Sequence, residues 1–376
     1  MNEKEISEIR RRFRQDKSNI THIRGCYVNE KKEIVTEFDE PLSMMDEEEC
    51  EKFLTILKRT LSGNLGKNLT DISFSTSQVV DSEEHRLLMS LRESDLKNDD
   101  VVREFFLRVA ESVSMDGHYL ILLAHDTYDV YYRSRDGQRQ DDASSEVYSY
   151  IVCSICPIKM TKPALSYYIP ENRFRNLQID RIVAPPEIGF IFPAFDDRCA
   201  NIYNALYYSK SPAGNHPEFA EAIFKTDLPM PADEQKETFE SILEDTLSDD
   251  CNLEVVQAVQ NQLCEKIEEH KAAKEDEPLT VSKSEVQEIL ESCGVAQEHI
   301  DSFSEKYDAE FGAECQLTPR NLVNTRQFQV STPSVVIRTS PDKSDLIETR
   351  VIDGVKYLLV RVEEGVEVNG VSIQIS

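Results

Sequence analysis

Apolar residues in the first third of the chain recur mostly at the spacing of α-helices. Ile6, Ile9 and Phe13 fall on one side of a helical projection and predict a helix at the start of the chain. The stretch 46–61 has an acidic first turn and a basic last turn, which complements the helix dipole. The expected helices cover residues 2–14, 46–61, 82–92 and 99–113. Apolar segments between them predict strands over residues 20–28, 34–38 and 69–74.

The hydrophobic pattern changes to that of β-strands near residue 118. Short segments rich in Val, Ile, Tyr and Phe follow one another, separated by polar or proline-rich loops. The expected strands cover residues 119–124, 130–132, 147–157, 164–169, 188–195 and 202–208. We therefore predict one sheet over 118–210, covered on one face by the helices that precede it.

Helical spacing returns between residues 232 and 312. An apolar stripe over 253–267 advances in steps of three and four and predicts a long amphipathic helix. Similar stripes over 286–293 and 300–311 predict two more helices, and Gly294 lies where a helix C-cap belongs.

The last fifty residues have the pattern of β-hairpins. Asp353-Gly354 and Asn369-Gly370 each separate two apolar segments, and both dipeptides readily adopt the positive φ angles of two-residue turns. The whole pattern predicts an α+β protein. We expect a mixed α+β domain with one main, largely antiparallel sheet at 1–230, an acidic helical segment at 231–315 and a small β domain of hairpins at 316–376.

The charge of the chain limits its partners. Forty-two Lys and Arg stand against seventy Asp and Glu, which gives a net charge of −28. Such an excess repels phosphate backbones and anionic membrane surfaces, so we expect neither nucleic acid nor a membrane as partner. Residues 232–312 carry twenty-three Asp or Glu against six Lys. We therefore expect a protein partner to bind these acidic helices.

The cysteines and the apolar runs indicate a cytoplasmic protein. The chain has nine cysteines, an odd number, and most of them are isolated, which is typical of reduced thiols rather than of a disulfide framework. The N-terminal residues lack the apolar core of a signal peptide. The longest purely apolar run, 119–124, is far shorter than the roughly 20 residues that span a bilayer.

Several stretches resemble those of a known family. They are HDTYDV at 125–130, EVYSYIVCSICPI at 146–158, GFIFPAFDDR at 189–198, NIYNALYYSK at 201–210 and the block from LTPRNLVN onward. The opening EISEIRRRF, followed by ITHIRGCYV, fits as well. Over nearly its whole length the chain resembles domain-of-unknown-function family 4317, a group of bacterial cytosolic proteins. The resemblance implies a natural, self-contained unit of this length and brings no activity with it.

Cys153 and Cys156 have the spacing of a redox or zinc-binding pair. Their surroundings have the pattern of a strand, however, and residues three apart on a strand point to opposite faces. No second pair of Cys or His at suitable spacing completes a zinc site. We interpret both as small buried apolar side chains.

Two groups of polar residues, each following an apolar run, make up the candidate site. The candidate site residues are His125, Asp126, Asp129, Asp196, Asp197 and Arg198. We expect both groups to lie where a strand ends and a loop begins, so that they converge if the two strands are neighbours. Converging carboxylates could bind Mg²⁺ or Mn²⁺ and activate water against a phosphoryl substrate. The other interpretation is turn chemistry, in which Asp caps the backbone and Arg198 pairs with an Asp.

Arg10, Arg11, Arg12 and Arg14 form the only dense basic stretch. They could bind an acidic partner or an RNA, but a run of like charges usually forms a solvated face, and we favour that interpretation. Pairing with the acidic helices 232–312 of the same chain is one form of it.

Two functions stay open from the sequence. The first is a non-enzymatic interaction or scaffold protein without a cofactor, which uses the acidic helices as a contact surface. The second is a metal-dependent hydrolase that uses Mg²⁺ or Mn²⁺ at the two Asp groups. The sequence has no phosphate-binding glycine loop, G-x-S-x-G elbow or H-E-x-x-H pair to favour another chemistry.

Overall fold

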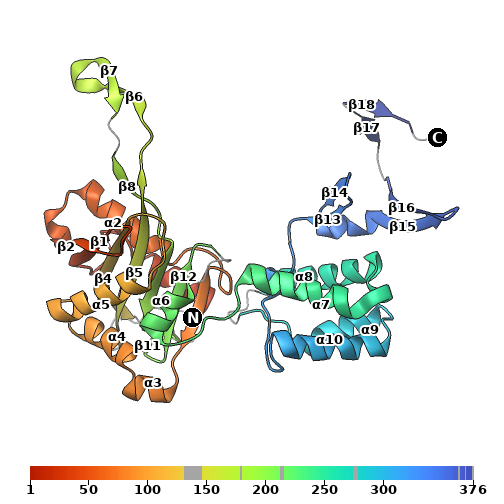
Figure 1. Cartoon of the computed structure of the whole chain (residues 1–376), viewed down its shortest axis with the longest axis horizontal. Coiled ribbons are helices and arrows are strands. Elements are labelled where there is room, and N and C mark those ends of the chain that lie inside the picture. Colours follow the sequence, from red (N-terminus) through yellow and green to blue (C-terminus); the bar gives the residue numbers. More distant parts are fainter. Residues whose placement is uncertain are drawn as a thin grey trace. The chain divides into compact units, whose positions relative to one another are not determined.

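The computed structural model describes residues 1–130, 146–177, 180–211, 216–273, 278–362, 365–368 and 370–374 (Figure 1). The chain divides into two compact units, Met1–Pro231 and Ala232–Ser376. The first is built around one main antiparallel sheet, and the second contains helices followed by small hairpins. The predicted α+β class is confirmed. The division into three domains stays a prediction.

The sheet of the first unit has its strands in the order β2-β1-β4-β5-β9-β12-β3, and each is antiparallel to its neighbours. An eighth strand, β8, pairs with the end of β5. The strands are β1 (His22–Val28), β2 (Ile34–Pro41), β3 (Leu69–Ser73), β4 (Tyr119–Val130), β5 (Glu146–Met160), β8 (Arg181–Val183), β9 (Ile188–Phe192) and β12 (Asn204–Ser209). The sheet is larger than the predicted one over 118–210, because β1, β2 and β3 join it from earlier in the chain.

Two segments of the predicted sheet pair elsewhere. β6 (Ala164–Tyr168) pairs with β7 (Arg173–Leu177), and β10 (Ala194–Asp196) pairs with β11 (Cys199–Asn201). The single strand predicted over 188–195 is divided at Pro193 into β9 and β10. Proline has no N–H to donate, so it does not continue the ladder with β5.

Helices cover both faces of the sheet, rather than the single face predicted (Figure 1). Apolar side chains of α4, α5 and α6 pack on one face, and those of α1 and α2 pack on the other. The helices are α1 (Glu3–Arg10), α2 (Glu47–Arg59), α3 (Thr76–Asp81), α4 (Glu83–Glu93), α5 (Asp99–Ser112) and α6 (Pro217–Phe224), with 3-10 turns η1 (Leu42–Met44) and η2 (Ile169–Glu171). Residues 119–124 of β4 are all buried, so both faces of the strand are apolar and need a cover.

The end of helix α2 lies very close to the sheet. Thr60 and Ser154 are buried, and their hydroxyl oxygens are 2.6 Å apart in a hydrogen bond. A Cβ atom at Gly189 would lie 2.4 Å from the carbonyl oxygen of Cys153 and 2.5 Å from Cγ2 of Thr60. This approach therefore requires glycine at position 189.

Strand β4 is longer than the sequence pattern predicts. His125, Asp126 and Asp129 lie within it, so the loop predicted after residue 124 is wrong. The cause is β5, which pairs with every residue of β4 from Tyr119 to Val130. The strand predicted over 130–132 overlaps β4 at Val130 only, and residues 131–132 lie outside the described part of the chain.

The second unit begins with helices, three of which fall on the predicted apolar stripes over 253–267, 286–293 and 300–311. The helices are α7 (Ala232–Leu247), α8 (Leu253–Ala273), α9 (Lys283–Ser292), α10 (Gln297–Glu310) and the short α11 (Pro319–Leu322), with the 3-10 turn η3 (Ser248–Asp250). Their apolar side chains, among them Leu263, Leu290 and Phe303, form one buried cluster.

Three hairpins, which we call the C-terminal hairpins (residues 328–373), follow these helices. They consist of β13 (Phe328–Ser331) with β14 (Val336–Thr339), β15 (Ile347–Ile352) with β16 (Val355–Val360), and β17 (Val366–Val368) with β18 (Val371–Ile373), and η4 (Pro341–Leu346) precedes β15. Asp353 and Gly354 have φ angles of +52° and +78°, as the predicted turn requires. The hairpin predicted at residues 369–370 is also present, although Asn369 itself lies outside the described residues.

Among the described helices, none has both the length and the apolar character that crossing a bilayer requires.

Candidate functional site

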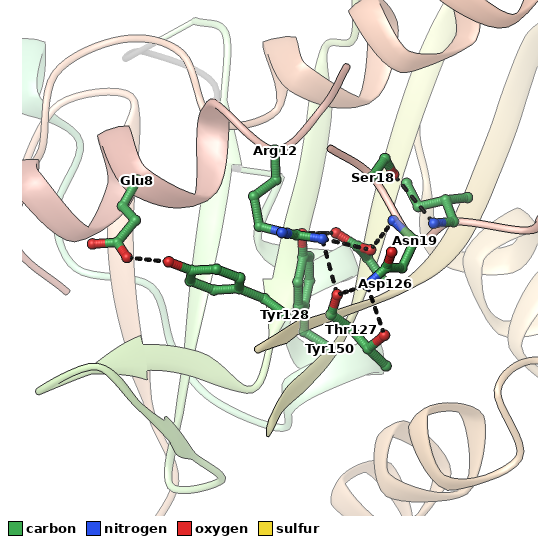
Figure 2. A network of polar contacts seen from close by, with 9 residues as sticks. Glu8, Arg12, Ser18, Asn19, Asp126, Thr127, Tyr128 and Tyr150 are labelled. Atoms are coloured by element: carbon green, nitrogen blue, oxygen red, sulfur yellow. Dashed lines mark hydrogen bonds and ion pairs between the residues drawn. The ribbon is translucent and has the colours of Figure 1, made fainter. Parts of the chain in front are cut away.

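Asp126 is the centre of a buried polar network on strand β4 (Figure 2). Its side chain is 1% exposed, and its carboxylate accepts hydrogen bonds from three residues. Arg12 donates through Nε at 3.1 Å, Tyr150 through its hydroxyl at 2.7 Å and Asn19 through its backbone N–H at 2.8 Å. A buried carboxylate is tolerated when a cation and further donors compensate it, and this one has both.

The network keeps two of its donors protonated. Burial alone would lower the pKa of Arg12, but the hydrogen bond and the charge of Asp126 raise this pKa overall. Burial is the main cause that raises the pKa of the Tyr150 hydroxyl, and the charge of Asp126 adds to it. Both side chains therefore donate to the carboxylate rather than exchange protons with it.

The chain between α1 and β1 is held against β4 by the same residues (Figure 2). Nη2 of Arg12 donates to the carbonyl oxygen of Thr127 at 2.9 Å, and Nδ2 of Asn19 donates to the same oxygen at 2.8 Å. The guanidinium of Arg12 also lies 4.6 Å from the centre of the Tyr128 ring. The solvated face predicted for the basic stretch is therefore wrong for Arg12, which is only 12% exposed and pairs within its own unit.

The second group of predicted site residues lies at the hairpin of β10 and β11. Asp196 forms an ion pair with the α-amino group of Met1 at 2.6 Å. Asp197 and Arg198 occupy the turn, with φ angles of +49° and +62°, and Asp197 is exposed. Arg198 forms an ion pair with Glu8 of helix α1.

Glu8 of helix α1 contacts both strand β4 and the turn between β10 and β11. Besides pairing with Arg198, Glu8 accepts a hydrogen bond from the Tyr128 hydroxyl of β4 at 2.6 Å. A metal ion at Asp126 or Asp196 would have to displace a cation that the protein itself supplies. Among the described residues, no three His, Cys, Asp or Glu side chains are grouped in a way that suits a metal ion. Asp129 is exposed near the end of β4.

His125 lies on the opposite face of β4 from Asp126, because successive residues of a strand alternate. Its Nε2 is 2.8 Å from the Ser149 hydroxyl and 3.4 Å from a carboxylate oxygen of Asp95. A Ser–His–Asp relay needs the serine and the aspartate on different ring nitrogens, whereas here both approach the same one. Burial lowers the pKa of His125, and the charge of Asp95 partly opposes this. The grouping is therefore suited to holding a neutral ring in place, and sequence spacing gave no sign of Ser149 or Asp95.

Cys153 and Cys156 lie on opposite faces of β5, as predicted. Cys153 belongs to the apolar cluster under α4 and α5, and Cys156 belongs to the cluster under α1 and α2. Burial raises the pKa of Cys156 to about 12 and also raises that of Cys153, so both remain thiols.

A two-stranded ribbon projects from the sheet of the first unit (Figure 1). We call its described residues, 158–177 and 180–183, the arm: the end of β5 pairs with β8, and β6 pairs with β7 beyond them. Its exposed large apolar side chains are Met160, Leu165, Tyr167, Ile169, Phe174, Ile182 and Val183. An isolated two-stranded hairpin is marginally stable in water, and a contiguous group of exposed apolar side chains is uncommon on soluble monomers.

The C-terminal hairpins expose a second set of apolar side chains. They are Val335, Val336, Val351, Ile352, Val355, Tyr357, Val360, Val362, Val368, Val371 and Ile373. Together with the arm, these hairpins carry eighteen of the twenty-five large apolar side chains that are exposed among the described residues. Exposed apolar residues are thus concentrated on two regions rather than scattered, which is typical of binding surfaces.

The sequence interpretation missed the arm, because it assigned 164–169 to the main sheet. A local signal was available in β7, where Arg173, Phe174 and Arg175 alternate between charged and apolar. Such alternation indicates a strand with one solvated face rather than a strand inside a covered sheet.

Comparison with models of protein families gives a match over nearly the whole chain. A family model with the description "Domain of unknown function (DUF4317)" matches residues 1–371. None of the curated proteins compared with the chain matches it.

Proposed function

Because the chain belongs to the family described as Domain of unknown function (DUF4317), whose description names no activity, we propose a function from the chain's own surface. We propose that it is a non-enzymatic protein that binds other proteins. The observation that carries this proposal is the concentration of exposed apolar side chains on the arm and the C-terminal hairpins. Removal of such surfaces from water by a partner makes a favourable contribution to the free energy of binding.

Charge and cysteines support finer parts of the proposal. The acidic helices 232–312 offer a second contact surface for a protein partner, and the net charge of −28 disfavours nucleic acid and anionic membranes. All nine cysteines belong to the described residues and none is in a disulfide, which supports a cytoplasmic location. The metal-dependent hydrolase stays a prediction that no observation here favours.

The proposal is tested by capture of partners in the cells that make the protein. The full chain carries a C-terminal tag, and the apolar face of the arm is changed by Leu165→Ser with Phe174→Ser. The matched control is Val35→Ser with Val80→Ser, which removes two exposed apolar side chains outside the arm and the C-terminal hairpins. We expect some proteins to be captured by both the wild type and the control. The amount of these proteins captured by the arm variant should be at least about tenfold lower, as when an interface loses an anchor residue. Recovery of the same proteins by all three chains would contradict the proposal.

A further inference from the structure

The outer part of the arm, formed by β6 and β7, has one apolar face. In the register of β6 and β7, Leu165 lies opposite Asn176 and Tyr167 lies opposite Phe174. Opposite residues share a face and neighbours along a strand alternate, so Leu165, Tyr167 and Phe174 lie on the same face. The centres of the Tyr167 and Phe174 rings are 5.2 Å apart.

The other face of the arm is cationic. Arg173 lies opposite Tyr168 and Arg175 lies opposite Ser166, and the guanidinium of Arg175 is 3.4 Å from the centre of the Tyr168 ring. Arg173 pairs with Glu171, but both are exposed, and exposed ion pairs are weak enough to change partners. The whole arm has five Lys or Arg against two Asp or Glu, in a chain of net charge −28.

Helix α10 of the second unit carries an acidic stripe that complements this face. Glu298, Asp301 and Glu305 are exposed at positions i, i+3 and i+7, so they lie on one side of the helix. Asp301 and Glu305 are about 6 Å apart along the helix axis. Arg173 and Arg175 are about 6.7 Å apart along their strand. The two guanidinium groups can therefore each bind one carboxylate of the stripe.

Resting on the proposed function, we propose that the partner of the arm is a second copy of this chain. The apolar faces of two arms pack against each other, and each arm binds the α10 stripe of the other copy through its cationic face. This arrangement covers both faces of the arm and uses the same surfaces on both copies, as a two-fold dimer requires. Arginine and carboxylate groups at this spacing form charge-assisted hydrogen bonds.

The size of the arm suits such a dimer. A specific interface of standard size takes about 20–30 residues from each partner. The described residues of the arm, 158–177 and 180–183, number twenty-four, so the arm and the α10 stripe together are large enough for one side of an interface of that class.

The test is sedimentation velocity on the full chain from about 1 to about 100 µM, a range around a micromolar Kd. We expect a dimer whose Kd rises between about 50 mM and about 500 mM NaCl, because salt screens the arm–helix pairs. Arg173→Glu with Arg175→Glu reverses the arm, and Glu298→Lys with Asp301→Lys and Glu305→Lys reverses the stripe. Each set alone is expected to raise Kd at least about tenfold, since several pairs are lost in each dimer.

A chain that carries both sets of substitutions is the decisive variant. In this variant, arms of reversed charge face stripes of reversed charge, so the dimer should form again. A variant that had lost dimerisation through misfolding would not recover in this way. The control is Arg14→Glu with Arg103→Glu, which reverses two exposed cations elsewhere in the first unit and should leave Kd unchanged. Leu165→Ser with Phe174→Ser should give a monomer throughout the range.

Three results would contradict the proposal that the partner is a second copy. In the first, the wild type stays monomeric over the whole concentration range. In the second, the wild type dimerises but the variant with both sets of substitutions does not, and in the third the protein is a monomer whose arm binds a labelled single-stranded RNA. A monomer that still captures another protein through its arm in cells overturns this inference but leaves the proposed function standing. A monomer that captures nothing through its arm overturns both.

Discussion

A carboxylate that is 1% exposed needs a compensating cation, and Asp126 has one in Arg12, 114 residues earlier in the chain. Tyr150 and Asn19 add the hydrogen bonds that the remaining lone pairs require. The acidic residue that suggested a catalytic group from its place in the sequence thus holds the N-terminal segment against the sheet. Arg198 does the same through Glu8.

The first prediction concerns this buried pair. Asp126→Asn keeps the shape of the side chain but leaves the guanidinium of Arg12 without its counter-charge, so we expect a loss of about 3 kcal/mol in the free energy of unfolding. Urea denaturation of the full chain measures it. Asp16→Asn, which removes an exposed carboxylate that pairs with Arg14, should cost less than about 1 kcal/mol. Equal losses in the two variants would show that Arg12 and Asp126 do not form a buried pair.

A second prediction concerns pH. Burial lowers the pKa of His125 below its ordinary value of 6.5, so the folded protein favours the neutral ring. Its contribution to stability is therefore present above about pH 6.5 and is lost as the pH falls through that value toward the lowered pKa. The fall in Tm between about pH 7.5 and about pH 5.5 should be smaller in His125→Gln than in the wild type.

The control for this pH prediction is His22→Gln, because His22 is exposed. His216, whose pKa burial also lowers, still titrates in both variants, so the fall in Tm shrinks without disappearing. Identical pH profiles for the wild type and His125→Gln would refute the role assigned to this ring.

At the scale of elements, the long antiparallel pair of β4 and β5 organises the first unit. The two strands pair over twelve consecutive positions, and helices are packed on both of their faces. The end of α2 reaches the sheet at the hydrogen bond between Thr60 and Ser154, and the absence of a side chain at Gly189 allows this.

Gly189→Ala tests this close approach. The added Cβ would lie 2.5 Å from Cγ2 of Thr60 at the end of α2 and 2.4 Å from the backbone carbonyl oxygen of Cys153. We therefore expect the free energy of unfolding to fall by about 2 kcal/mol. Gly365→Ala places a methyl group in open space and should change stability by less than about 0.5 kcal/mol. Chemical denaturation of both variants decides the matter, and equal stabilities would mean that α2 does not lie this close to the sheet.

Elements whose causes are local could be predicted from the sequence. Helices α8, α9 and α10 follow from apolar stripes, and the hairpin at Asp353 and Gly354 follows from turn chemistry. The extent of β4 could not be predicted, because Asp126 is tolerated there only through Arg12 and Tyr150, which are distant in sequence. The pairing partners of Asp126 and Arg198 could not be predicted for the same reason, because they come from other elements.

At the scale of the whole molecule, the charge of −28 affects every stability measurement. Like charges repel one another in the folded state, so any salt that screens them stabilises the protein. A metal effect must therefore be compared with NaCl at the same ionic strength.

The last prediction uses that comparison to test the hydrolase. Asp126 and Asp196 already pair with cations of the protein, so Mg²⁺, Mn²⁺ and matched NaCl should raise Tm equally. An ion that binds only the native state would raise it further. An additional rise with either divalent ion that disappears in Asp196→Asn would contradict this prediction and support the hydrolase.

The positions of Cys153 and Cys156 give the protein two internal reporters of its own unfolding. Each thiol is buried beneath a different layer of helices, although only two residues separate the two cysteines on strand β5. A thiol reagent reaches Cys153 only when the layer of α4 and α5 lifts, and it reaches Cys156 only when the layer of α1 and α2 does. The labelling rates of these neighbouring atoms therefore measure separately how often the two sides of the sheet open.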